Sequence, residues 1–174
     1  MDPFASATLM QQRTQGEITS TTHPYLVQEL EAASRAIRNF CRWHVAKAET
    51  LTYQRSGRFE ADVWLPAMEI SSITKVTLDG VEWTDLDAVE FDGRTGWTNL
   101  RGRRVEVEYV AGYIEVPADI EMLTLELAAG GLGTALNISR EQAGGVAVTY
   151  SRSSGAMTAL DEGRLVQYRL GRVP

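Results

Sequence analysis

The only cysteine of the chain lies three residues before one of its two histidines. Cys41 and His44 belong to the stretch ASRAIRNFCRWHV, and on a helix they would share one face because residues three apart are neighbours there. A thiol beside an imidazole can be a nucleophile with its base, or half of a metal site. It can also be a pair of semi-polar residues that line a helix interface.

The rest of the sequence offers this pair no chemical partner. A metal site needs three or four ligands, and a catalytic thiol needs a positioned base and an oxyanion site. The other histidine, His23, lies about five turns earlier on the same predicted helix and cannot join them. We therefore expect Cys41 and His44 to pack, and we expect no catalytic residue, no metal site and no cofactor.

Three further patterns could carry chemistry but have simpler interpretations. The glycines of AAGGLG (128–133) lack the lysine and the strand-loop-helix context of a phosphate loop. The turn DGRTG (92–96) lacks the remaining oxygen ligands of a calcium loop. Glu106 and Glu108 would share one face of a strand, as a glycosidase pair might, but solvated charge is the usual state of an alternating strand.

Composition is that of a soluble globular protein of one domain, or one domain with an appendage. The chain has 174 residues, 44% of them hydrophobic, and a net charge of −6. Residues 51–110 hold seven basic and eleven acidic side chains. This balance argues against a protein that wraps nucleic acid, and no stretch approaches the roughly 18 apolar residues of a membrane span. One cysteine forms no internal disulfide, and the N-terminus lacks the basic region of a signal peptide.

The hydrophobic pattern predicts an α+β fold. Long amphipathic helices over 23–46 and 117–136 are expected to pack together, with a small antiparallel β-sheet (59–113) inserted between them. Asp79-Gly80 and the turn 92–96 are expected to form exposed, acidic hairpin turns of this sheet. The glycines at 128–133 indicate a kink, a break or a close approach of another backbone in the second helix.

Extended arms are expected at both ends. Residues 1–22 are polar and predict an arm with at most a short helical turn, outside an adaptor-like core over 23–142. Residues 143–174 predict a second arm, in which SRSSG (151–155) is a flexible spacer. Thr158 and Asp161 resemble a capping box that opens a short last helix.

The order of four stretches resembles the head-to-tail adaptor (connector) proteins of long-tailed bacteriophages. The first is LVQELEAASRAIRNFCRWHVAKAETLT, and the second is VWLPAMEISSITKVTLDGVEW. The third is VEVEYVAGYIEVPADIEMLTLELAA, and the fourth is GGVAVTYSRSSGAMTALDEGRLVQYRLGRVP. The likeness spans residues 23–174, and it lies in the joint order and spacing of the stretches, not in any one of them.

This resemblance implies a structural virion protein made in the host cytoplasm and placed in the neck between capsid and tail. Such a protein forms a homo-oligomeric ring, expected to be a dodecamer, that binds under the portal protein after DNA packaging. The ring offers an attachment site to a stopper or tail-terminator protein, and DNA passes through its lumen without specific binding. A stopper or tail-completion protein of the same neck is the alternative, and a small cysteine-dependent enzyme is a weaker one.

The expected interface residues come from two places. The resemblance implies packing and subunit contacts for Cys41, Trp43 and His44. A last helix of about twelve residues is marginal alone in water, so we expect its apolar side chains to dock on another chain, with the portal as first choice and an adjacent subunit as second. The residues expected to take part are Leu160, Arg164, Leu165, Tyr168, Arg169, Leu170 and Arg172.

Overall fold

The computed structural model describes residues 1–133, 140–143, 146–149 and 156–171, which form two compact units. The helical unit consists of Met1–Phe40 and Pro117–Gln167, and the sheet unit consists of Cys41–Val116 and Tyr168–Pro174. The helices and the small antiparallel sheet confirm the predicted α+β class. Each unit joins two stretches that are far apart in the sequence.

Helix α2, Leu26–Cys41, buries the apolar stripe that predicted it. The buried residues of the stripe are Leu26, Leu30, Ala33, Ile37 and Cys41. The helix is shorter than the predicted 23–46, because Arg42 has φ +66°, a left-handed conformation that ends a helix. Trp43 and His44 therefore lie beyond the helix, and the expectation that His44 shares a helical face with Cys41 is wrong.

The N-terminal residues form part of the helical unit. Helix α1, Ala7–Arg13, is capped by the Ser6 side chain, which accepts a hydrogen bond from the Leu9 amide. Phe4 and Met10 are buried, and the Phe4 amide donates a 2.9 Å hydrogen bond to the Ser34 hydroxyl in the middle of α2. The expected extended arm over 1–22 is wrong, because these apolar side chains bury against the unit itself.

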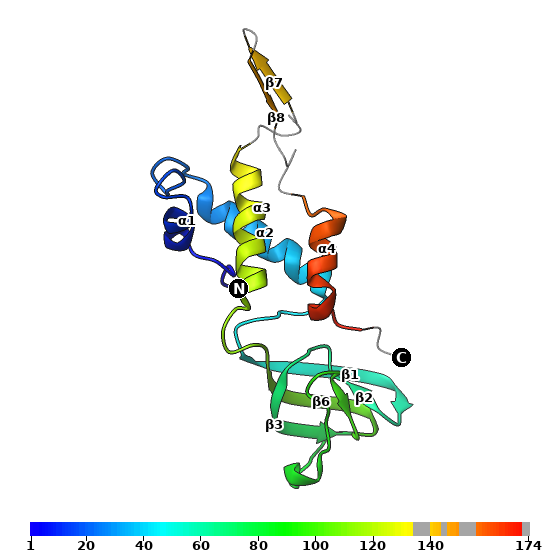
Figure 1. Ribbon diagram of the computed structural model, residues 1–174. Coiled ribbons are helices and arrows are strands. Elements are labelled where there is room, and N and C mark those ends of the chain that lie inside the picture. The colour runs from blue at the N-terminus through cyan, green and yellow to red at the C-terminus, as the bar shows by residue number, and fades with distance from the viewer. Residues whose placement is uncertain (134–139, 144–145, 150–155, 172–174) are drawn as a thin grey trace. The chain divides into compact units, whose positions relative to one another are not determined.

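Helix α3, Ala118–Gly133, runs through its glycines without a break. Figure 1 shows α3 crossing α2, and a Cβ at Gly131 would collide with the Glu29 carboxylate. Of the three alternatives for the glycines, the structure therefore favours the close approach, although the neighbour is a side chain of α2 and not a backbone. Apolar residues are buried on several sides of α3 and not along one stripe, as expected for a helix inside a core.

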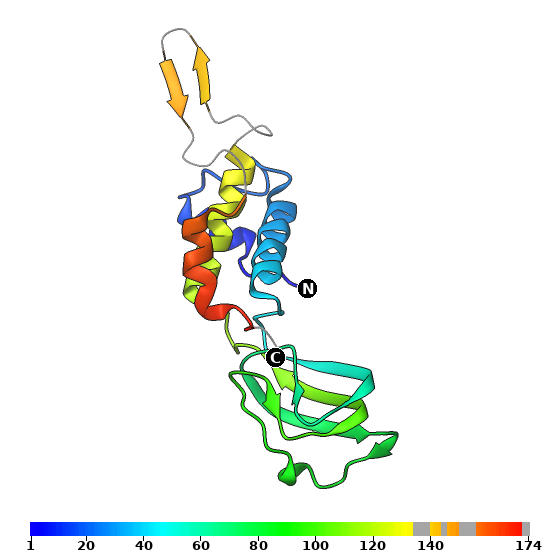
Figure 2. The ribbon, with the colours of Figure 1, turned by 90° about the vertical axis from the view of Figure 1, so that its right-hand side faces the viewer.

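The last helix, α4, spans Ala159–Leu165 and continues into a 3₁₀ turn, η2, at Val166–Tyr168. The predicted capping box is confirmed, since Thr158 and Asp161 exchange both expected hydrogen bonds. Figure 2 shows α4 beside α3, and a 2.9 Å ion pair joins Arg164 of α4 to Glu126 of α3. Strands β7 (Arg140–Ala143) and β8 (Val146–Thr149) form a separate antiparallel hairpin, and the predicted spacer 151–155 lies outside the described residues.

The sheet unit contains a four-stranded antiparallel sheet in the order β1-β6-β3-β4. Its strands are β1 (Glu49–Glu60), β3 (Ile70–Leu78), β4 (Val81–Glu82) and β6 (Gly102–Ala111). Figure 1 shows β1, β6 and β3 side by side. The first strand begins ten residues before the predicted 59–113 region, because its mostly polar side chains give an edge strand only a weak alternating signal.

Two short strands and a 3₁₀ turn complete the sheet unit. They are β2 (Val63–Trp64), β5 (Trp97–Thr98) and η1 (Leu86–Ala88). The predicted turn at Asp79-Gly80 is confirmed, with both residues at positive φ as a two-residue hairpin requires. The turn at 92–96 is confirmed as well, and its Asp92 carboxylate accepts hydrogen bonds from the Arg94 amide and the Thr95 hydroxyl, which lower the pKa of Asp92.

Alternate residues of β6 point to two different environments. Val105, Val107 and Tyr109 are buried, whereas Glu106 is exposed and Glu108 is half-buried on the opposite face. The two carboxylates therefore lie on the wet face of the sheet, as the alternating pattern indicates.

Candidate functional site

Cys41, the last residue of α2, is a buried thiol. Burial raises the pKa of this thiol to about 12, and the positive charge of Arg169 offsets only part of the effect. The thiol is thus protonated at neutral pH, whereas a nucleophile or a metal ligand must be a thiolate. Within the described part of the chain, no group of three or more histidine, cysteine, aspartate or glutamate side chains could hold a metal ion.

His44 is anchored to the central strand of the sheet. Its Nε2 atom lies 2.9 Å from the carbonyl oxygen of Ala111, which can only accept, so Nε2 donates this hydrogen bond. The next residue, Gly112, has φ +114°, and a Cβ there would lie 2.5 Å from Nε2 of His44 and 3.1 Å from the carbonyl oxygen of Lys47. Only glycine at this position leaves room for the imidazole.

A chain of ring contacts runs from His44 through Trp43 and Tyr113 to Tyr168. The Trp43 ring meets the His44 ring edge-on at 5.3 Å and lies 6.1 Å from the Tyr113 ring. The Tyr113 ring meets the Tyr168 ring edge-on at 5.9 Å. We refer to Trp43, His44, Tyr113 and Tyr168 as the aromatic cluster, and the edge-on geometry of its first and last pairs is favourable for rings.

Two hydrogen bonds tie the C-terminal segment to the end of α2 and to the residues that follow it. The indole Nε1 of Trp43 donates a 2.6 Å hydrogen bond to the carbonyl oxygen of Tyr168, across 125 residues of sequence. The Leu170 amide donates a 2.9 Å hydrogen bond to the carbonyl oxygen of Cys41. These bonds and the aromatic cluster fix the C-terminal segment on the sheet unit.

The expected docking of the last helix on another chain is wrong for its main apolar residues. Leu165 is only 1% exposed, and Tyr168 and Leu170 are each 8% exposed within the single chain. The expectation assumed that the two long helices already complete the core. Leu165 instead belongs to the core of the helical unit, and the other two residues belong to the sheet unit.

The remaining predicted interface residues differ in exposure. Leu160 is 78% exposed, and Arg169 is exposed as well. Arg164 is held by Glu126 of its own unit, and Arg172 lies outside the described residues. The structure thus brings together Cys41, Trp43, His44, Tyr168 and Leu170, which were predicted as interface residues for two unrelated reasons.

Sequence reasoning missed Gly112 and Tyr113 as members of this site. Both stand directly after the alternating residues of β6, in the stretch Tyr-Val-Ala-Gly-Tyr. A glycine at the end of a strand indicates a close approach of other atoms, and this signal could have found them.

The chain resembles known proteins in both sequence and fold. A family model described as "Head completion protein" matches residues 8–156. No curated protein matches the chain. Among the described residues, no helix is long and apolar enough to cross a membrane.

Two similar solved structures share the fold over nearly the whole chain. A chain of the neck of a native GTA particle, computed with C12 symmetry, has a TM-score of 0.59 and 14% identity, covering 95% of this chain and 91% of that one. A chain of the neck of an empty GTA particle, computed with C6 symmetry, also has a TM-score of 0.59, with 16% identity, 97% of this chain and 90% of that one. Because the family model matches well over half of the residues, the chain belongs to the head completion protein family.

Proposed function

We propose that this protein is a structural component of the neck of a phage-like particle, where it acts as the head-to-tail adaptor. In this role it binds under the portal once DNA is packaged and provides the attachment site for the stopper or tail. The family match over residues 8–156 is the observation that carries the proposal. The likeness in fold to chains of two GTA necks supports it.

A homo-oligomeric ring follows from this role. The two similar chains come from necks computed with C12 and C6 symmetry, which supports a ring and makes a dodecamer the first choice. DNA must move through such a ring, and a net charge of −6 suits a wall that does not hold phosphates. Exposed Leu160 and Arg169 remain candidates for contact with the portal or an adjacent subunit.

A structural role also agrees with the chemistry of the strongest catalytic candidate. Cys41 is buried and keeps its proton, and His44 donates its hydrogen bond to a backbone carbonyl. Neither residue is prepared for nucleophilic attack. Both instead help to fix the chain segments that meet at the aromatic cluster.

Removal of the gene tests the neck role. Particles produced without the protein should accumulate as DNA-filled heads that lack tails, and protein supplied separately to these heads should restore tail attachment. Tailed particles formed in its absence, or heads that fail to package DNA, would contradict the proposal. Electron microscopy of purified particles distinguishes these outcomes.

Direct binding to isolated portal rings separates an adaptor from a stopper. An adaptor should bind the portal without any other neck protein, and co-sedimentation of the purified full chain with portal rings measures this. A stopper or tail-completion protein should bind only after another neck protein has joined the portal. The helical unit favours the adaptor, since the stoppers of such necks are expected to be mainly β-barrels.

A further inference from the structure

A small pocket lies on the sheet unit next to the end of β4. It has a volume of about 250 Å³, and five of its seven lining residues are apolar: Leu78, Trp83, Ala88, Val89 and Leu100. Val89 and Leu100 are buried, whereas Trp83 is 45% exposed, so the lining passes from the core of the unit to its surface. Small-molecule sites usually measure about 300–1,000 Å³. The smaller volume of this pocket suits one anchoring side chain of a protein partner.

Trp83 is held in place at the mouth of the pocket. Its indole Nε1 donates a 2.7 Å hydrogen bond to the carbonyl oxygen of Asp85, and its backbone amide donates a 2.8 Å hydrogen bond to the carbonyl oxygen of Val76 in β3. Val81, two residues earlier, is 71% exposed. Tryptophan is enriched among the residues that dominate binding energy at protein interfaces, and a ring that is already held loses little freedom on binding. The mouth of the pocket therefore has an apolar surface with a fixed anchor point.

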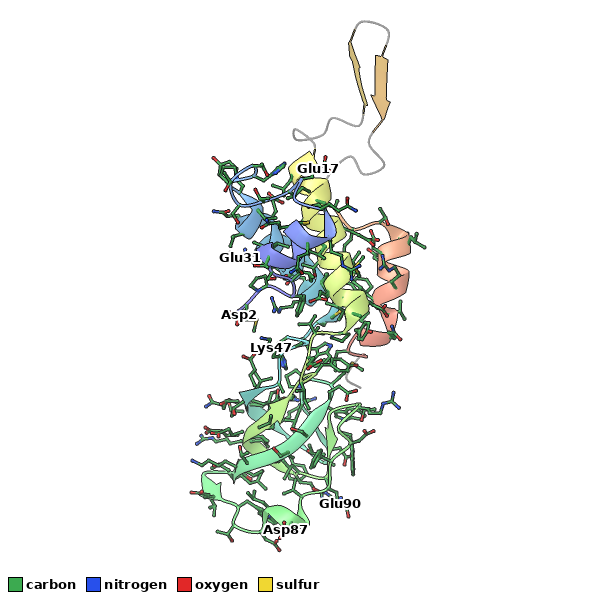
Figure 3. The ribbon with its side chains drawn as sticks, turned by 60° about the vertical axis from the view of Figure 1, so that its left-hand side comes forward. Asp2, Glu17, Glu31, Lys47, Asp87 and Glu90 are labelled. Carbon is green, nitrogen blue, oxygen red and sulfur yellow. The ribbon has the colours of Figure 1, made fainter. Side chains whose placement is uncertain are left out.

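Acidic residues accompany the lining residues along the chain. Four exposed carboxylates precede, separate or follow the lining residues of the segment 83–89: Glu82, Asp85, Asp87 and Glu90. None of the four forms an ion pair with another described residue. No lysine or arginine occurs between Leu78 and Asp92. Figure 3 shows the side chains of Asp87 and Glu90 at the margin of the sheet unit.

The one base that lines the pocket does not balance these acids. Arg101 is exposed, and its single positive charge against four carboxylates leaves a net charge of −3 around the pocket. The next charged residues along the chain on either side, Asp79 and Arg103, cancel each other. The surroundings of the pocket therefore attract basic groups and repel phosphates.

We propose that this pocket docks a basic segment of another neck protein. An apolar side chain of that segment enters beside Trp83, and lysine or arginine side chains on either side of it meet the four acidic residues. An apolar centre inside a charged rim is the usual anatomy of a protein interface. The inference rests on the proposed neck function and deepens it, because it names the surface that takes the partner and the chemistry of the partner segment.

A second copy of this chain fits the pocket less well. Each copy carries a net charge of −6, so acidic surfaces of two copies repel each other. The sheet unit does contain an exposed apolar residue beside bases, since Phe59 follows Arg55 and Arg58. Glu60 and Asp62 come within three residues of Phe59, however, and they cancel the charge of that stretch. The complementary partner is therefore a different chain.

Photo-cross-linking in assembled necks tests which chain occupies the pocket. Thr84→Cys places a thiol between Trp83 and Asp85 at an exposed position, and a maleimide–benzophenone label is attached to it. The labelled full chain is supplied to DNA-filled heads that lack the protein, and the tailed particles that form are irradiated. Mass spectrometry should find the link on another neck protein, in a segment where lysine and arginine outnumber aspartate and glutamate.

Two controls accompany this experiment. Thr52→Cys, at an exposed position of β1, carries the same label and should not reach the same segment. The natural chain treated with the reagent is the blank, since the buried Cys41 thiol keeps its proton and reacts slowly.

A synthetic peptide with the sequence of the linked segment gives a second readout. Fluorescence anisotropy measures its affinity for the purified full chain. Trp83→Ala should weaken binding on the order of tenfold or more, because it removes the ring beside the anchor. Asp85→Asn with Asp87→Asn should weaken binding by a similar factor at low salt, and the loss should shrink at high salt, where exposed charges are screened. Glu17→Gln with Glu31→Gln makes the same change in net charge on the helical unit and should leave the affinity unchanged.

Several outcomes would overturn the inference. A link to a second copy would make the pocket part of a contact between subunits. A link to an acidic segment, or no link in particles that carry tails, would show that no basic segment docks here, while the neck function stands. Unchanged affinity in the Asp85→Asn, Asp87→Asn chain would exclude the charged contacts, and this variant keeps its fold because Asp85 makes no side-chain capping bond. Heads that stay without tails when the natural chain is supplied would instead remove the proposed function and this inference with it.

Discussion

Gly112 illustrates how one residue without a side chain positions several that have one. It sits between the end of β6 and Tyr113, and its positive φ turns the chain toward the aromatic cluster. The space it leaves is filled by the His44 imidazole, whose Nε2 atom donates to the neighbouring carbonyl of Ala111. The histidine that first suggested catalysis therefore acts as a packing and hydrogen-bonding residue.

Substitution of Gly112 by alanine should lower the free energy of unfolding by about 2–4 kcal/mol, because it combines left-handed strain with a steric clash. Chemical denaturation followed by tryptophan fluorescence measures the loss. Gly163→Ala is the matched control, since Gly163 lies within α4 with nothing near its missing Cβ. This control should stabilise the protein by about 0.5–1 kcal/mol. Equal effects of the two substitutions would contradict the role of Gly112.

The raised pKa of the Cys41 thiol predicts that the folded protein loses stability in alkaline solution. Its pKa rises from 9.0 to about 12 in the folded chain, so the folded state disfavours the thiolate. The unfolded chain releases this proton first, and stability that is complete below pH 9 falls as pH rises toward 12. The expected loss from this group is at most about 1.4 kcal/mol per pH unit in that window.

Urea titrations between pH 8 and 10.5, in the presence of a reductant, measure this slope. Cys41→Ala should be less stable at pH 8 but should show a shallower decline above pH 9. Buried Tyr109, whose pKa is also raised to about 12 by burial, would keep its own contribution above pH 10 in both proteins. An identical slope with and without the thiol would show that Cys41 ionises equally well in the folded chain.

Helix α4 is the element whose role changed most between sequence and structure. Its capping box and apolar residues are readable in the sequence, and so is its short length. The sequence does not reveal which surface the apolar residues bury against, because this depends on contacts such as Arg164 with Glu126, across 38 positions. A short helix of marginal stability has the same sequence features whether it packs against its own chain or against another chain.

Leu165→Ala should destabilise the isolated chain by about 2–5 kcal/mol, the usual cost of removing a buried leucine side chain. Leu160→Ala, on the same helix, should change stability by no more than about 0.5 kcal/mol because Leu160 is exposed. Thermal or urea unfolding of the purified protein measures both. If Leu165→Ala leaves the isolated protein unchanged but blocks assembly, α4 docks on another chain after all.

The types of the helices and strands were largely predictable from the sequence, whereas their boundaries and their packing partners were not. The stripe of α2 and the turn at Asp79-Gly80 follow from periods of 3.6 and two residues and from turn chemistry. Helix α2 ends at Cys41 because Arg42 adopts a left-handed conformation. Glycine usually marks such a position, and the sequence has an arginine there instead. Edge strand β1 was only partly foreseen, because its polar residues resemble a loop.

The whole molecule is organised by contacts that local patterns do not encode. Its two units each combine residues from both halves of the chain, and the Trp43–Tyr168 bond spans 125 positions. The sequence therefore predicted two separate groups of site residues, one at the end of α2 and one in the C-terminal segment, without indicating that they are in contact. The order of the four sequence stretches nevertheless indicated a neck protein, because that order can be recognised without predicting any tertiary contact.

Net charge gives a prediction for the complete protein. With 23 acidic and 17 basic side chains, it should not retard duplex DNA in an electrophoretic mobility assay at physiological ionic strength. A variant with several acidic surface residues changed to lysine is the positive control, and it should bind DNA with strong salt dependence. Salt-sensitive binding by the natural chain would contradict a DNA path that does not hold phosphates.

The division of each unit between distant stretches of sequence has a consequence for synthesis on the ribosome. The first forty residues need Pro117–Gln167 to complete the helical unit, and the sheet unit needs the segment that starts at Tyr168. Neither unit can close until the segments that end at Gln167 and begin at Tyr168 have left the exit tunnel. A nascent chain that stops before these segments therefore lacks the contacts that complete both units, and we expect such incomplete copies to be absent from assembled particles.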